Sequence, residues 1–74
     1  QPANKHLKID FKFNDNAKKT LSLFDVNGKD VLFKEIPSNS NNLNLDVSQL
    51  EPGVYYIKLQ SNTSVYTKQV QIIR

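Results

Sequence analysis

Apolar and polar residues alternate along almost the whole chain, and this alternation limits the folds open to it. In residues 6–13 every second side chain is apolar, and five further strand-like segments follow: 20–25, 30–36, 43–47, 54–59 and 65–74. A period of two is typical of strands with one face on a core, and no segment keeps a helical period over several turns. The sequence therefore predicts an all-β fold, a small antiparallel immunoglobulin-like β-sandwich of six or seven strands.

Length and composition restrict the chain further. Its 74 residues are expected to form a single domain over residues 1–74. There is no cysteine, so no disulfide and no thiolate metal site is available, and no apolar run approaches the ~18 residues of a membrane-spanning helix. The net charge is +3, but the lysines are spread along the chain. They predict a solvated face and not a nucleic-acid-binding stripe.

The clearest turn lies at Asn27-Gly28. A two-residue type I′ hairpin there would place apolar residues of one flanking strand opposite polar residues of the other. A three-residue loop, with Gly28 in the left-handed position of a G1 bulge, aligns the apolar residues of the two strands. This register predicts two opposed pairs: Leu23 with Val31 and Leu21 with Phe33. It leaves two apolar side chains on the outer face of the sheet: Phe24 and Leu32.

Residues 51–54 read Glu-Pro-Gly-Val, which predicts a type II turn with glycine at the position of positive φ. The strand after this turn should place Tyr55, Ile57 and Leu59 on one face. In the last strand, Lys68 lies within an otherwise apolar row: Tyr66, Val70 and Ile72. The stem of Lys68 can pack on the sheet with its ammonium group at an edge, the reading that we favour, or the charge can serve recognition.

No residue pattern indicates an enzyme. His6 is the only histidine, and it lies on a polar strand face, whereas a catalytic set would need it in a cleft beside Ser and Asp. Residues 25–30 resemble the start of a calcium loop, but glycine comes at the fourth place and Lys29 takes the fifth. A hairpin turn fits these residues better, so we expect no catalytic residue, no metal site and no cofactor.

Three motifs follow one another along the chain. They cover residues 23–31 (LFDVNGKDV), 45–55 (LDVSQLEPGVY) and 66–72 (YTKQVQI). Their order and spacing resemble the type A C-terminal sorting domain of the type IX secretion system of Bacteroidota, and the resemblance covers nearly the whole chain. The chain departs from the family pattern at Phe24, where Tyr is usual, and at Val47, where Leu is common. Of the Tyr-Pro-Asn-Pro motif that usually begins such a domain, only Gln1-Pro2-Ala3 remains.

The resemblance implies a transport signal and not a catalyst. Such a domain follows an N-terminally fused cargo, here expected upstream of residue 1, which reaches the periplasm by means of a separate signal. The outer-membrane type IX translocon then recognises the folded domain. A surface sortase-like cysteine peptidase usually removes it, and the cargo stays at the cell surface or enters the medium. Neither nucleic acid nor membrane insertion is implied.

The final strand is our candidate for the part of the domain that acts as the export signal, because it stands at the end of the chain and carries a lysine in an apolar row. The residues expected to meet the translocon are Lys68, Val70, Ile72 and Arg74. The motif turns are expected at Asp25, Gly28, Lys29, Gly53 and Tyr55.

A module of another class stays open as an alternative. Leu50, Pro52 and Tyr56 fit the spacing of the fibronectin-III corner, Leu-x-Pro-x-x-x-Tyr, but the predicted inward row selects Tyr55 and not Tyr56. The chain also lacks Trp and is short for that fold. The alternatives are a fibronectin-III-like or carbohydrate-binding adhesion module, or a structural spacer of a surface protein.

Overall fold

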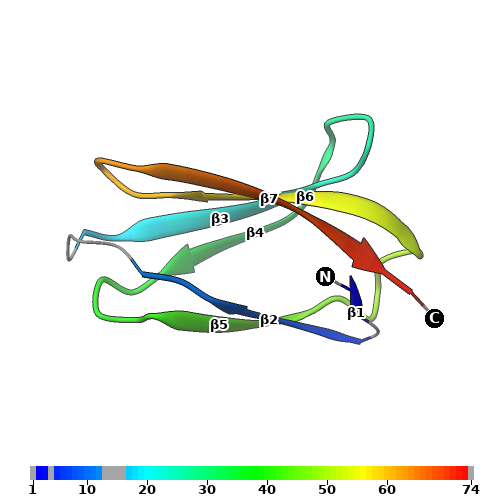
Figure 1. Cartoon of the computed structure of the whole chain (residues 1–74), viewed down its shortest axis with the longest axis horizontal. Coiled ribbons are helices and arrows are strands. Elements are labelled where there is room, and N and C mark those ends of the chain that lie inside the picture. Colours follow the sequence, from blue (N-terminus) through cyan, green and yellow to red (C-terminus); the bar gives the residue numbers. More distant parts are fainter. Residues whose placement is uncertain (1, 4, 13–16, 74) are drawn as a thin grey trace.

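Two layers of β-strands make up the fold. The computed structural model describes residues 2, 3, 5–12 and 17–73, and Phe13, the predicted turn at 14–16 and Arg74 lie outside them. The strands are β1 (Pro2–Ala3), β2 (His6–Asp10), β3 (Lys19–Phe24), β4 (Asp30–Ile36), β5 (Asn42–Asp46), β6 (Gly53–Gln60) and β7 (Val65–Ile72). Figure 1 shows β2 and β5 as the lower layer. The described residues contain no helix that could cross a membrane.

The larger sheet has the strand order β1-β7-β6-β3-β4, and the smaller sheet pairs β2 with β5. Neighbouring strands are antiparallel except β1, which runs parallel to β7 beside Gln71 and Ile72. With β2 and β5 as strands B and E, and β3, β6 and β7 as C, F and G, this is the immunoglobulin arrangement with β4 as strand C′. The predicted small β-sandwich is confirmed.

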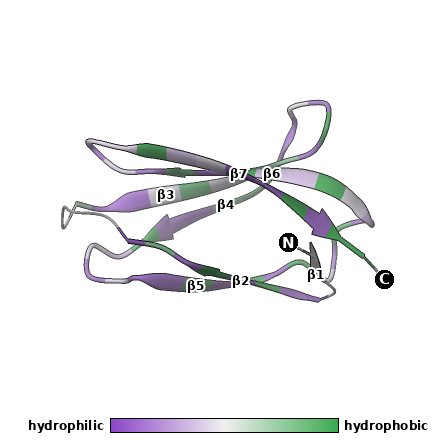
Figure 2. Ribbon diagram, viewed as in Figure 1, coloured by the Kyte–Doolittle hydropathy of each residue, from purple (hydrophilic) through white to green (hydrophobic). Residues whose placement is uncertain are grey.

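Inward-facing side chains of both sheets form one core. Alternate residues are buried along the strands, as Leu21 and Leu23 are in β3, and Tyr55, Ile57 and Leu59 in β6. Figure 2 shows that apolar and polar residues succeed one another along the strands of both layers. The other core members are Leu7, Ile36, Leu45, Val47, Val70 and Ile72. The sequence alternation therefore identified the inward rows of β2, β3, β5 and β6.

Lys19 is an exception to the prediction that the lysines are solvated. It begins β3 in the same inward row as Leu21, and only 2% of its surface is exposed. Its Nζ donates a hydrogen bond of 2.9 Å to the carbonyl oxygen of Ala17. The prediction was wrong at this position because the strand period carries Lys19 to the core side.

The loop between β3 and β4 is the predicted three-residue loop. Gly28 has a φ of 81°, and its N–H donates to the carbonyl oxygen of Asp25 over 3.0 Å. The Asp25 Oδ1 accepts the backbone N–H groups of Asn27 and Lys29 at 2.9 and 3.0 Å. Asp25 and Lys29 also pair through their backbone, since the Asp25 N–H donates to the Lys29 carbonyl at 3.0 Å. These bonds explain the aspartate and the glycine of the Asp-x-x-Gly-Lys pattern, whereas Lys29 contributes only its backbone groups.

A bulge on β4 shifts the register beyond this loop. Phe24 faces Asp30, as a three-residue loop requires, but Leu23 faces Leu32, so Val31 is an extra residue on β4. The two predicted pairs were therefore wrong: Leu23 with Val31 and Leu21 with Phe33.

The same bulge changes which side chains reach the outer face. Val31 and Leu32 both pack against the core, whereas Phe33 is 59% exposed. The prediction that Leu32 faces outward was wrong, because one inserted residue moves every later side chain of the strand to the other face. Phe24 remains half-buried on the outer side, opposite Tyr56 of β6.

The chain enters β6 without the predicted type II turn. Such a turn has a φ of about +80° at its third residue, whereas Gly53 has a φ of 155° and already pairs with Ile72 of β7. The carbonyl oxygen of Glu51 accepts a hydrogen bond of 2.6 Å from the hydroxyl of Tyr55. This is the tyrosine corner of immunoglobulin-like sandwiches, in which a Tyr near the start of strand F bonds to the backbone just upstream. The corner is therefore present, and Tyr55 forms it where the fibronectin-III spacing pointed to Tyr56.

Replacement of Gly53 by Val should destabilise the domain by about 1–3 kcal/mol. A Cβ at Gly53 or Gly28 would have no atom within 4 Å, so the cost comes from the positive φ alone. Gly28→Val should be disruptive for the same reason. Lys29→Ser, which keeps the backbone bonds of the loop, is the control and should be nearly neutral. Thermal unfolding measures all three, and an unchanged melt of Gly53→Val would contradict the backbone argument.

The Tyr55→Phe variant should lose about 1 kcal/mol of unfolding free energy, because the ring stays in the core while the corner hydrogen bond is lost. Tyr56→Phe is the matched control, since that side chain lies on the outer face and is 43% exposed. Urea denaturation compares the two. Equal stability of both variants would show that the corner bond adds nothing.

Calcium should leave the melting temperature unchanged. The Asp25 carboxylate already accepts two backbone N–H groups, and no group of three His, Asp or Glu side chains in the described part of the chain could hold an ion. Thermal melts with excess calcium and with a chelator test this expectation. A calcium-dependent rise would instead make Asp25, Asn27 and Asp30 candidate ligands.

Candidate recognition surface

The residues predicted to meet a partner on the final strand have different surroundings. Val70 and Ile72 are each 1% exposed and belong to the core. Lys68 is exposed, although it shares their inward row and lies opposite Ile57 of β6. Arg74 lies outside the described residues. Of the three described positions, only Lys68 presents its side chain to a partner of the folded domain.

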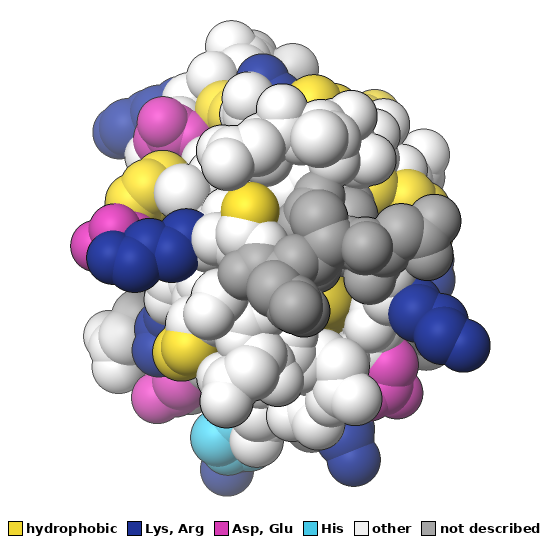
Figure 3. All heavy atoms as spheres, turned by 90° about the vertical axis from the view of Figure 1, so that its left-hand side faces the viewer, with side chains coloured by type: hydrophobic (Ala, Val, Ile, Leu, Met, Phe, Trp, Pro, Cys, Tyr) yellow, Lys and Arg dark blue, Asp and Glu magenta, His cyan; other side chains and the backbone are white. Residues whose placement is uncertain are grey.

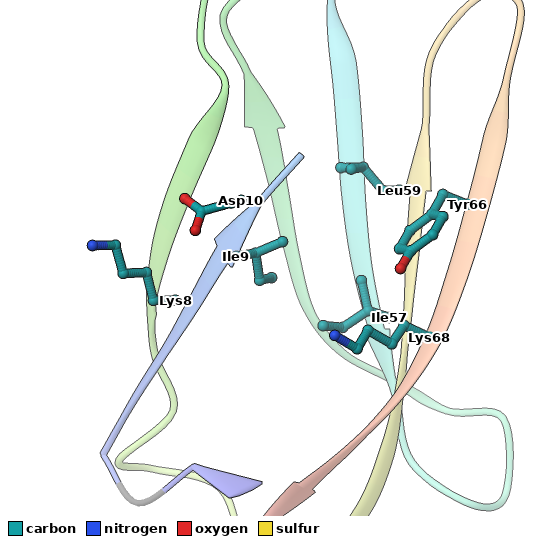
Figure 4. A pocket seen from close by; sticks show the side chains of 7 residues that line it. All are labelled: Lys8, Ile9, Asp10, Ile57, Leu59, Tyr66 and Lys68. Atoms are coloured by element: carbon teal, nitrogen blue, oxygen red, sulfur yellow. The ribbon is translucent and has the colours of Figure 1, made fainter. Parts of the chain in front are cut away.

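A hollow of about 210 Å³ opens beside Lys68, between β2 and β7. Figure 4 shows Lys68 and Tyr66 projecting from β7, with the Lys68 side chain extending toward β2. Ile57 and Leu59 of β6 lie opposite them in the sheet and line the hollow together with Ile9. The floor is therefore apolar, and the stem of Lys68 lies along it.

A second hollow of about 240 Å³ continues the first. It is lined by Phe11 and Lys12, which follow β2, and it shares three lining residues with the first hollow: Asp10, Leu59 and Tyr66. The two hollows together form a single depression along the opening between the sheets, which we call the β2–β7 groove. The alternation of apolar residues could not reveal this groove, because its two walls come from opposite ends of the chain.

The outer face of the larger sheet carries a second exposed surface. Phe24 and Tyr56 are directly opposed on β3 and β6, and Phe33 of β4 faces Ser22, two residues before Phe24. Aromatic side chains at such diagonal positions are within reach of one another. We call these three residues, Phe24, Phe33 and Tyr56, the outer aromatic patch. The sequence indicated Phe24 but placed Leu32 where Phe33 stands.

Charged side chains form no extended patch of one sign on the end of the sandwich drawn in Figure 3, where lysines and acidic residues are intermixed. This distribution agrees with the spread of lysines along the sequence. On this end, the described residues show no continuous basic stripe of the kind that nucleic-acid recognition commonly uses.

His6 does come close to an aspartate and a serine, but in the wrong order for catalysis. It faces Asp46 across the β2–β5 pair, and the Ser48 hydroxyl donates to the Asp46 Oδ1 over 2.6 Å. Bonds from the Ser48 hydroxyl and N–H hold the pKa of Asp46 below its ordinary value, with a small contribution from His6. A serine nucleophile would instead donate to the histidine. All three residues are exposed, so this cluster is a surface turn.

The other motif residues serve the fold. Asp25, Gly28 and Lys29 close the β3–β4 loop, Gly53 begins β6, and Tyr55 forms the corner. These contacts shape the domain, whereas the β2–β7 groove and the outer aromatic patch present exposed apolar side chains.

Comparison with known families agrees with the motifs. A family model described as "Secretion system C-terminal sorting domain" matches residues 1–73, essentially the whole chain. No curated protein matches the sequence. Domains of this family generally act as non-enzymatic tags on exported cargo and interact with the type IX secretion machinery. The chain therefore belongs to the family of secretion-system C-terminal sorting domains and serves as a sorting signal for type IX secretion.

Proposed function

We propose that the outer-membrane type IX translocon reads this domain in its folded state, as the tail of a cargo attached upstream of residue 1. The cargo passes through the periplasm, and a surface sortase-like cysteine peptidase then removes the domain. The domain itself is a substrate and not an enzyme. The observation that carries this proposal is the family match over residues 1–73, in a chain whose three motifs build one continuous sandwich.

Recognition in the folded state favours exposed groups over buried ones. Val70 and Ile72 contribute by anchoring β7 in the core, where each is 1% exposed. They hold Lys68 at the mouth of the β2–β7 groove. We therefore propose Lys68 as the residue of the final strand that contacts the translocon, with Arg74 as a further candidate beyond the described residues.

The adhesion-module alternative has less support. The tyrosine corner relates the chain to fibronectin-III and other immunoglobulin-like domains, but a shared architecture does not carry a shared function. The outer aromatic patch is the one feature that would suit adhesion, and it serves equally well as a second contact for the secretion machinery.

Deletion of residues 71–74 should abolish export, but it tests two things at once. It removes the buried Ile72 and both residues of β7 that pair with β1. Loss of export would then follow from a loosened sandwich as readily as from a lost contact. A substitution that leaves the core intact is the better experiment.

Lys68→Gln should block export and spare the fold. The variant keeps a long side chain over the apolar floor, and a change at an exposed position shifts stability by no more than about 1 kcal/mol. A reporter fused upstream of residue 1 should then accumulate in the periplasm. Lys58→Gln is the matched control, because Lys58 lies on the outer face of the neighbouring β6 opposite Thr67, and its fusion should be exported normally.

Normal export of the Lys68→Gln fusion would assign this residue to packing alone. The recognition surface would then move to the outer aromatic patch, which Phe33→Ser would test in the same reporter.

A further inference from the structure

The β2–β7 groove combines apolar lining residues with a lysine at its mouth. Four charged residues border its two hollows: Lys8, Lys12, Lys68 and Asp10. Figure 4 shows Lys68 reaching across the mouth toward β2, while Lys8 and Asp10 both point away from it on the far side of β2, so the charge drawn at the mouth is positive. The groove therefore suits a partner that has both apolar and negatively charged groups.

The strand beside the groove offers a backbone edge. On the side of β7 away from β6, β1 pairs with Gln71 and Ile72 only, so among the described strands it leaves the edge beside Val65, Tyr66 and Thr67 uncovered. Val65 and Tyr66 are also 57% and 51% exposed. An edge of this kind can accept an extended segment of another chain through main-chain hydrogen bonds.

The other edge of the larger sheet is less suited to such pairing. On β4, the bulge at Val31 interrupts the ladder, and the charged residues Asp30, Lys34 and Glu35 flank it. Bulges and charges are the devices that commonly prevent strand addition at an edge, and β7 has one charged residue, Lys68, where β4 has three and a bulge. The β7 register, in contrast, is regular over all eight pairs with β6.

We propose that the β2–β7 groove binds an extended acidic segment of a partner protein, which adds as a strand to the edge of β7. Side chains of such a segment point alternately to the two faces of the sheet. Those on the inner face would enter the groove, with an apolar side chain against Ile9 and Tyr66 and a carboxylate beside Lys68. That the partner belongs to the secretion machinery rests on the proposed function, whereas the binding itself does not.

Titration of the isotope-labelled 74-residue chain with a synthetic peptide tests the proposal. The probe is a capped peptide of about nine residues, within the usual length of a strand, in which every second residue is valine or glutamate in turn and the residues between them are serine, so that valine and glutamate share one face. Amide shifts are expected at residues 65–69 and 8–12, with affinity that falls as salt is raised. The same peptide with glutamine in place of glutamate should bind about tenfold more weakly, a loss of one charge-pair interaction of ~1.4 kcal/mol.

Charge reversal supplies the matched variants. Lys68→Glu should weaken binding of the glutamate peptide by about tenfold or more, while Lys58→Glu, the same change on the outer face, should leave it unchanged. A dispersed spectrum of each variant confirms its fold, and Lys68→Gln provides a milder second variant if the reversal unfolds the domain.

Several results would overturn the proposal: no binding, shifts confined to the outer aromatic patch, equal affinity for the glutamine peptide, or equal binding of inorganic polyphosphate, which would show attraction by charge alone.

Failure of the proposed function would give a different result. If the Lys68→Glu domain no longer binds the peptide but a reporter fused to it is exported normally, the groove binds as proposed and its partner is not part of the export machinery.

Discussion

The inward row of β6 is the element on which the rest of the domain depends. Tyr55, Ile57 and Leu59 are all buried, and β6 pairs with β7 along its whole length and with β3 over five residues. Burial of one such side chain contributes about 1.5–3 kcal/mol, a large amount for a domain of this size. The rows of β3 and β7 pack beside this one, and the bond from Tyr55 to Glu51 holds the entry of the strand.

The unequal size of the two sheets produces the candidate recognition surface. Two strands cannot cover the inner face of five, so the inward row of β7 is buried at Val70 and Ile72 but exposed at Tyr66 and Lys68. A lysine in a core row would be costly if its charge had to be buried. At this end of β7 the ammonium group reaches the groove instead, which explains how one row can be apolar core at one end and charged surface at the other.

The motifs that carry the family resemblance contain two kinds of residue: those that build the sandwich, and those, such as Tyr66 and Lys68, that are exposed beside the groove. Asp25, Gly28, Gly53 and Tyr55 act through backbone geometry and internal hydrogen bonds. A signal that is read in the folded state needs both sets, because the first builds the sandwich and the second lies on its surface. Under the proposed function, loss of either set stops export, whereas only loss of the first also lowers the melting temperature.

Alternation alone determined the strands, their inward faces and the all-β class, since period two assigns each side chain to a face without reference to any neighbour. The Asn-Gly turn signal identified the loop glycine, because Gly28 at positive φ is a local requirement. Alternation failed on β4, where Val31, Leu32 and Phe33 are apolar in succession, so that either register buries apolar side chains and only packing against the core selects the bulge. The parallel pairing of β1 and the exposure of Lys68 were likewise decided by the tertiary structure, because both depend on which segment distant in sequence lies alongside β7.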